Sequence, residues 1–206
     1  MTAQIKEIGD FLMDAVKEKR TVGFALCGSF CTFEIMIPII QSLCATGYKV
    51  IPIMSEYAYA TDTRFGRAAD FVTQFENITD HRVLHTIPEV EPFGPRALLD
   101  LLIIAPCTGN TVNKLAFGIT DTCVTMAAKA HLRNERPVLI AVSTNDALAN
   151  TAKAIGSLLN YKNIYFVPMK QDSPHTKPRS IVAEFDLIPE AAEAALESRQ
   201  LQPIYC

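Results

Sequence analysis

A polar turn that follows a buried strand carries the strongest chemical signal in this sequence. Residues 101–105 form an unbroken apolar run, and Pro106 is expected to end the strand because proline cannot donate to a sheet ladder. Residues 108–111 (TGNT) follow, and a helical apolar pattern begins at Val112. Such a turn aims unpaired N–H groups and the positive end of a helix dipole into a crevice. We therefore expect it to hold an anion or a polar ring edge, and the alternative is an ordinary capped turn.

Two further polar turns follow predicted strands. Gly28 and Ser29 lie after the β-rich run 21–26, and residues 143–145 follow the apolar run 137–142. Right-handed connections place the carboxyl ends of such strands at one edge of the sheet, where ligands bind in open α/β folds. Three converging polar turns with few formal charges favour a phosphate-bearing ring over a bare metal ion or a catalytic triad.

Strands that alternate with helices must position these turns. The pattern predicts an open, doubly wound α/β fold with a parallel sheet of about six strands. No linker or repeat divides residues 1–206, so we expect one domain. It begins with an amphipathic helix over 1–20, has a polar, proline-rich loop over 168–188 and closes with a helix over 189–199.

Composition limits the functional classes. The chain has 206 residues, 49% hydrophobic and 20% charged, with a formal net charge of −3. This balance favours a globular core and gives no electrostatic basis for a nucleic acid or anionic membrane partner. Six cysteines without a C-x-x-C pair are typical of reduced, buried thiols in a cytoplasmic protein. Neither a signal peptide nor a membrane span is expected.

The polar turns resemble those of the flavin-dependent cysteine decarboxylase superfamily. Residues 106–111 (PCTGNT) resemble its Pro-Ala-Ser-Ala-Asn-Thr signature, and residues 114–121 resemble the continuation of that signature. Residues 28–29 are similar to its first phosphate loop, and residues 83–85 to the segment that carries its active-site histidine. Residues 141–145 (AVSTN) stand where the superfamily has Ala-Pro-Ala-Met-Asn.

The resemblance implies a flavodoxin-like three-layer sandwich, a homo-oligomer and FMN as the cofactor. It implies catalytic roles for His85 and Asn145, and a substrate contact for Asn145. Lys177 and Arg179 are predicted to contact an anionic substrate, because both are basic and Arg179 can bind a carboxylate through two donors. The cofactor-binding residues expected from the matched positions are Gly28, Ser29, Phe30, Ser55, Pro106, Thr108, Gly109, Asn110 and Thr111.

Within the superfamily, the loops at 27–31, 142–148 and 167–172 most resemble one branch. Its members help to make pyridine-2,6-dicarboxylate during sporulation. The resemblance implies oxidation of a dihydrodipicolinate-type precursor together with a dehydrogenase-like partner protein that carries NAD(P). The substrate would be a small cyclic dicarboxylate.

Departures from the superfamily pattern keep other functions open. Only Asn145 is retained from Pro-Ala-Met-Asn, and residues 168–180 hold no counterpart of the cysteine-bearing lid. The alternatives are a non-catalytic partner of the dehydrogenase-like protein and an FMN-dependent decarboxylase. His85 also fits an exposed histidine at a strand end, Asn145 fits a helix cap, and Lys177 and Arg179 fit residues of a solvated loop. No metal site is expected.

Overall fold

A seven-stranded sheet forms the middle layer of the protein. The computed structural model describes residues 20–206, and the helix predicted over 1–20 lies outside them except for its last residue. The strand order is β2-β1-β3-β4-β7-β6, and β5 also pairs with β4. The strands are β1 (Thr21–Leu26), β2 (Lys49–Met54), β3 (Leu101–Cys107), β4 (Val138–Thr144), β5 (Ile164–Phe166), β6 (Met169–Ser173) and β7 (Lys177–Ala183).

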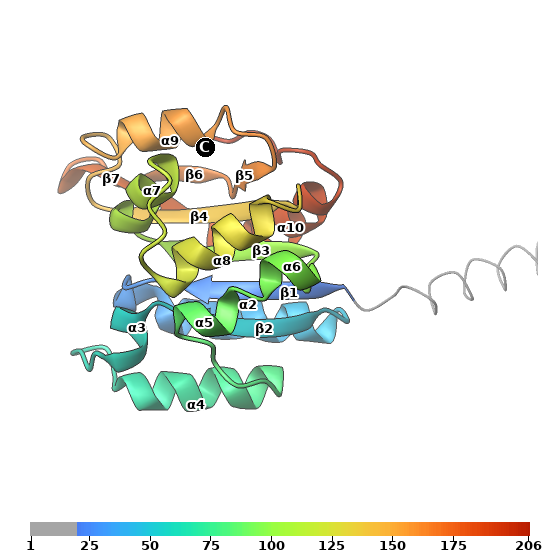
Figure 1. The fold of residues 1–206 in the computed structure, drawn as a ribbon. Coiled ribbons are helices and arrows are strands. Elements are labelled where there is room, and N and C mark those ends of the chain that lie inside the picture. The colour runs from blue at the N-terminus through green and yellow to red at the C-terminus, as the bar shows by residue number, and fades with distance from the viewer. Residues whose placement is uncertain (1–19) are drawn as a thin grey trace, which may run out of the picture.

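Helices cover both faces of the sheet (Figure 1). Helices α2 and α10 pack on one face, and α5, α6 and α8 lie on the other. Every residue of β3 is buried, as expected for the central strand of a sheet covered on both sides. The helices are α2 (Phe33–Ala45), α3 (Glu56–Ala60), α4 (Ala68–Thr79), α5 (Ile87–Val90), α6 (Phe93–Arg96), α7 (Gly109–Ala116), α8 (Cys123–Leu132), α9 (Ala152–Leu158) and α10 (Ile188–Leu196), with 3-10 turns η1 (Phe30–Thr32) and η2 (Phe185–Leu187).

The open α/β, flavodoxin-like fold predicted from the sequence is confirmed, but the sheet is mixed and not wholly parallel. Strands β1 to β5 pair in parallel, whereas β7 runs antiparallel to β4 and to β6. Strand β5 lies beside the first half of β4, and β7 lies beside its last two residues, Ser143 and Thr144. The β6–β7 hairpin therefore extends the sheet at its carboxyl edge.

The prediction of an irregular loop over 168–188 was wrong, because β6 and β7 form this hairpin. Most side chains of β6 and the first half of β7 are exposed, so their polar composition reflects the rim of a sheet and not a loop. Strand β7 lies between β4 and β6, but β4 pairs only with Ile181 and Val182, so the stretch around Pro178 is unpaired on that side and tolerates proline. The polar run 174–176 is the hairpin turn, since Ser173 pairs with Lys177.

Smaller differences lie near the predicted turns. Strand β3 continues one residue past Pro106, with an irregular register between Ile104 and Cys107. Helix α9 starts at Ala152 and not directly after the turn at 143–146, because residues 146–151 form further turns. The segment 83–85, which carries His85, forms a single bridge from Leu84 to Ile53 of β2. Among the described residues, no helix has the length and apolar character needed to cross a membrane.

Candidate functional site

A cavity of about 900 Å³ opens where three polar turns and the hairpin meet. The first two turns follow β1 and β3, and the third begins within the last two residues of β4, so the convergence predicted for them is confirmed. The volume falls within the range of small-molecule and cofactor sites. Of the predicted site residues, the cavity is lined by Gly28, Ser29, Thr108, Gly109, Asn110, Asn145 and Lys177.

Neutral donors line the turn side of the cavity. The hydroxyl oxygens of Ser29 and Ser143 lie 3.0 Å apart, and this contact spans β3 to join the first turn to the third. Asn110 and Asn145 are exposed, and neither side chain makes a hydrogen bond within residues 20–206. Their amides are therefore available to a ligand, each with donors and an acceptor.

Charged side chains line the hairpin side. Lys177 Nζ lies 2.6 Å from Asp172 Oδ2, and Lys170 forms an ion pair with Glu184. Both lysine side chains are at least half exposed, so solvent screens these ion pairs and they contribute little to stability. A ligand carboxylate can consequently replace the internal carboxylate as the partner of either lysine.

Six predicted site residues lie outside the cavity lining: Phe30, Ser55, His85, Pro106, Thr111 and Arg179. Ser55 caps helix α3, because its hydroxyl oxygen accepts a hydrogen bond from the Ala58 N–H at 3.3 Å. Arg179 is an exposed residue of β7. Its carbonyl oxygen accepts a hydrogen bond from the Leu148 N–H at 3.0 Å, which fastens the hairpin to the turn region after β4.

His85 lies near the β2 end of the rim. Its ring stacks on the Tyr59 ring at 3.6 Å with an interplanar angle of 1°. Glu89 Oε2 accepts the backbone N–H groups of His85 and Thr86, both at 3.0 Å, and the Thr86 hydroxyl at 2.9 Å. The second Glu89 oxygen pairs with Arg82 at 2.6 Å. Burial acts to raise the pKa of Glu89, but these hydrogen bonds outweigh it and lower the pKa to about 2.

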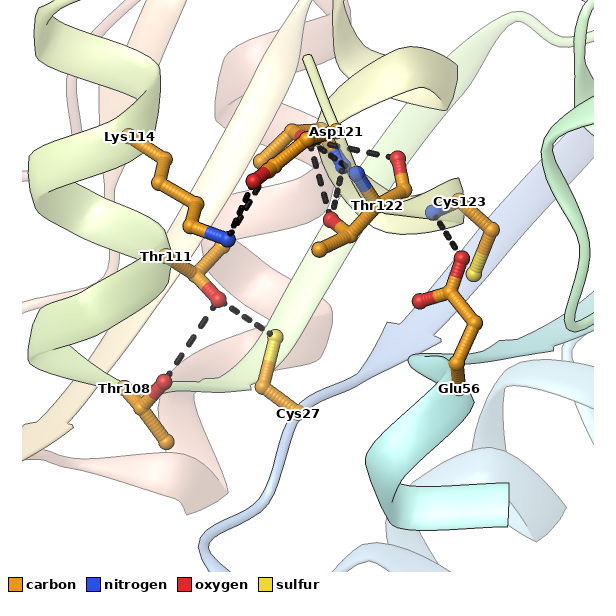
Figure 2. A network of polar contacts seen from close by, with 9 residues as sticks. Cys27, Glu56, Thr108, Thr111, Lys114, Asp121, Thr122 and Cys123 are labelled. Atoms are coloured by element: carbon orange, nitrogen blue, oxygen red, sulfur yellow. Dashed lines mark hydrogen bonds and ion pairs between the residues drawn. The ribbon is translucent and has the colours of Figure 1, made fainter. Parts of the chain in front are cut away.

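Thr111 is used inside the protein, as Figure 2 shows. Its hydroxyl donates to Cys27 Sγ at 3.2 Å and lies 3.5 Å from the Thr108 hydroxyl. A hydrogen bond from Cys107 lowers the pKa of Cys27, whereas burial raises the pKa of Cys107 well above its usual value. Both thiols are buried, as expected for these two cysteines from the sequence.

The same network fixes the elements around the signature turn. Lys114 Nζ on α7 lies 2.8 Å from an Asp121 oxygen before α8, and Glu56 Oε1 on α3 accepts the Cys123 N–H at 2.8 Å (Figure 2). Glu56 thereby satisfies an N–H group in the first turn of α8, one of the groups that helices leave unpaired. An ion pair thus joins α7 to the segment before α8, and a hydrogen bond joins α3 to α8.

Sequence reasoning did not assign several cavity residues, including Ser143, Asp146, Asp172 and Glu184. Ser143 and Asp146 lie in or beside a turn that the sequence does predict, so position alone was a usable signal. Asp172 and Glu184 carried no such signal, because their place in the cavity depends on the hairpin.

Known proteins resemble this chain over most of its length. The Flavoprotein family model matches residues 13–188. The B subunit of dipicolinate synthase from Bacillus subtilis (strain 168) is 45% identical over 192 residues, which cover 93% of this chain and 96% of that protein. These matches confirm the resemblance drawn from the turn signatures.

Solved structures agree with the sequence comparisons. The crystal structure of the dipicolinate synthase B subunit from Bacillus halodurans C matches with a TM-score of 0.84 and 42% identity, over 91% of this chain and 96% of that chain. Burkholderia xenovorans DmrB in complex with FMN matches with a TM-score of 0.66 at 17% identity, over 88% of this chain and 98% of that chain. At this identity the second match shows the fold alone.

Proposed function

The chain belongs to the Flavoprotein family, and from that premise we propose that it works as the B subunit of a dipicolinate synthase. In this proposal it binds FMN and a small cyclic dicarboxylate, and it takes part in oxidising a dihydrodipicolinate-type precursor to pyridine-2,6-dicarboxylate during sporulation. Its partner is the dehydrogenase-like A subunit of dipicolinate synthase, which carries NAD(P). The observation that carries the proposal is the cavity in which the three polar turns meet.

The donors on the turn side of the cavity fit a flavin phosphate. Asn110 offers an amide with no partner within residues 20–206, and the Ser29 hydroxyl lies at the same wall. Asn110 also stands in the first turn of α7, where backbone N–H groups favour an anion. We propose that Gly28, Ser29, Thr108, Gly109 and Asn110 hold FMN, which when bound supplies a two-electron acceptor.

The substrate would lie between the turns and the hairpin. The Asn145 amide can donate to one carboxylate of a cyclic diacid, and Lys177 can exchange Asp172 for the other carboxylate. Lys177 is the stronger candidate of the two basic hairpin residues, because Arg179 lies outside the cavity lining. Two-point binding of this kind would fix the orientation of the substrate ring.

His85 remains a proposed acid–base group. Its Nδ1 atom is buried without a hydrogen bond within residues 20–206 and lies 3.7 Å from Glu89 Oε2, so the proton-transfer role would fall to the Nε2 atom. Since the ring lies outside the cavity lining, this role requires a ligand that extends from the cavity toward β2. We also propose that the protein forms a homo-oligomer.

One observation favours a second function, a non-catalytic partner of the dehydrogenase-like protein. The cavity lining contains four carboxylates, Asp146, Asp172, Glu184 and Asp186, but two lysines, Lys170 and Lys177. This excess of negative charge opposes the binding of a phosphate dianion. In the second function the FMN site would be vestigial.

Reconstitution separates the two functions. The purified chain is titrated with FMN, and it is then mixed with the dehydrogenase-like partner and NAD(P) in an assay for pyridine-2,6-dicarboxylate. The first proposal predicts saturable FMN binding and product formation that falls in Ser29→Ala and Asn110→Ala variants. A chain that binds no FMN, and whose variants still activate the dehydrogenase-like partner fully, would establish the second function.

A further inference from the structure

Asp146 lines the cavity and joins several neighbouring side chains. Its Oδ1 atom accepts hydrogen bonds from the Thr144 hydroxyl at 2.6 Å and the Thr151 hydroxyl at 2.9 Å. Its backbone carbonyl accepts the Ala149 N–H at 2.9 Å. One aspartate therefore connects the end of β4 to the start of α9 across the intervening turns.

The same network reaches the first turn of α7. The side-chain amide of Asn113 donates to the Thr151 hydroxyl at 2.8 Å and to the Gly109 carbonyl at 2.7 Å. Through Thr151 and Asn113, Asp146 is linked to the turn that carries Asn110. The two turns that present Asn110 and Asn145 to the cavity are thus fastened to each other.

Gly109 is required by this network for reasons of space. A Cβ atom at position 109 would lie 2.6 Å from Asp146 Oδ1, 2.6 Å from the Thr144 hydroxyl and 2.9 Å from the Thr151 hydroxyl. Side-chain atoms do not approach a Cβ atom so closely, so any larger residue would displace these groups. The network and the glycine depend on each other.

Two departures from the superfamily signatures meet at this point. Gly109 stands where the Pro-Ala-Ser-Ala-Asn-Thr signature has its second alanine, and Thr144 stands where Ala-Pro-Ala-Met-Asn has methionine. In the structure both contact Asp146. The absence of a Cβ atom at 109 makes room for the hydroxyl at 144 and the carboxylate at 146.

We infer that Asp146 is a positioning residue that holds Asn110 and Asn145 toward the same cavity. The role proposed for it is one of hydrogen-bond geometry, since its Oδ1 atom accepts two internal donors, and it is separate from any effect of its charge on the ligand. The inference rests on the proposed function only in taking FMN as the ligand.

Two substitutions separate geometry from charge. Asp146→Ala removes the acceptor and leaves the backbone bond to Ala149, whereas Asp146→Asn keeps an Oδ1 acceptor without the negative charge. We expect Asp146→Ala to raise amide hydrogen exchange in residues 143–151 of the ligand-free protein and to weaken FMN binding about ten-fold, roughly the value of one lost hydrogen bond. Asp146→Asn should restore exchange to the unmodified level and FMN affinity to within about three-fold.

A double-mutant cycle tests the inference without any ligand. Gly109→Ala should accelerate unfolding strongly in the unmodified protein and less in the Asp146→Ala background, where one of the three clashing groups is gone. Thermal melting verifies that each variant is folded. Failure of the unmodified protein to bind FMN would count against the proposed function, whereas the exchange and cycle measurements would still decide the inference. Unchanged exchange in Asp146→Ala, additive effects in the cycle, or equal damage from Asp146→Asn and Asp146→Ala would overturn it.

Discussion

The two halves of the sheet rim use their polar side chains differently. On the half formed by the turns after β1, β3 and β4, Asn110 and Asn145 face the cavity without a hydrogen-bond partner within residues 20–206. On the half beside β2, Ser55 caps a helix and Glu89 accepts three hydrogen bonds from neighbouring groups. The comparison teaches that a polar residue at a rim is available to a ligand only when the fold has not already used it.

The β2 half should therefore respond to substitution through stability. Glu89→Ala would leave the N–H groups of His85 and Thr86 and the charge of Arg82 without their partner. We expect the free energy of unfolding to fall by about 2 to 4 kcal/mol, measured by urea denaturation at neutral pH. A loss below about 0.5 kcal/mol would show that Glu89 is not the anchor of this segment.

The dependence of stability on acid pH gives a second test of the role of Glu89. The pKa of Glu89 is about 2 in the folded protein against an ordinary value of 4.5, so its contribution is complete above pH 4.5 and is lost as the pH falls toward 2. Glu89→Gln keeps an acceptor oxygen without an ionisable group. It should flatten the fall of stability over this pH window, whereas an unchanged acid limb would mean that other carboxylates cause the fall.

The cavity half should respond through binding. Asn110→Ala removes an amide with no internal partner, so we expect FMN affinity to fall about ten-fold while the melting temperature stays within about 2 °C. His85→Ala should weaken FMN binding less, because His85 lies outside the cavity lining. Fluorescence titration of both variants makes the comparison. Equal or reversed effects of the two variants on FMN affinity would contradict the view that only the cavity half of the rim binds the ligand.

A matched pair of serines gives a smaller effect. Ser55→Ala removes an N-cap and should lower the free energy of unfolding of the ligand-free protein by about 1 kcal/mol. Ser29→Ala removes a hydroxyl whose side-chain contacts are with Ser143 and Cys31, and it should cost less than about 0.5 kcal/mol. Equal losses in urea denaturation would mean that both halves of the rim use serine structurally.

The smallest expected change in stability is at the hairpin. Lys177→Ala breaks an ion pair whose lysine side chain is 58% exposed, so solvent screens the pair and the urea midpoint should not change measurably. Affinity for pyridine-2,6-dicarboxylate should nevertheless fall, and the loss should shrink as salt is added. Calorimetric titration at two salt concentrations measures this. Affinity that does not depend on Lys177 would remove the hairpin from the substrate site.

Local patterns predicted much of the fold. The strand, turn and helix order around Asn110 is as the sequence indicated. The hairpin was missed because β6 and β7 alternate poorly at the exposed rim, and because β7 pairs with β4, which ends at Thr144, far from Lys177 along the chain. Pairing over such distances depends on tertiary contacts that periodicity does not record.

The sequence predicted where the site residues lie along the chain, but not which of them are free to bind a ligand. The signature located Thr108, Asn110 and Thr111 at one turn, yet Thr111 is bonded to Cys27, and that contact depends on the neighbouring strand β1. Asp146, in contrast, was assigned no role from the sequence, although the structure gives it one. It reads as one more polar residue after a strand, and its hydrogen bonds to Thr144 and Thr151 emerge only when the following turns fold back. Only the folded structure shows which polar atoms already have a hydrogen-bond partner inside the protein.

The most direct test of the account is a crystal structure of the protein with FMN and pyridine-2,6-dicarboxylate. The account predicts electron density for the flavin in the cavity in contact with Ser29 and Asn110, and density for the diacid between Asn145 and Lys177. Ligand density that contacts none of these four residues, or a cavity that stays filled with solvent at saturating ligand, would contradict it.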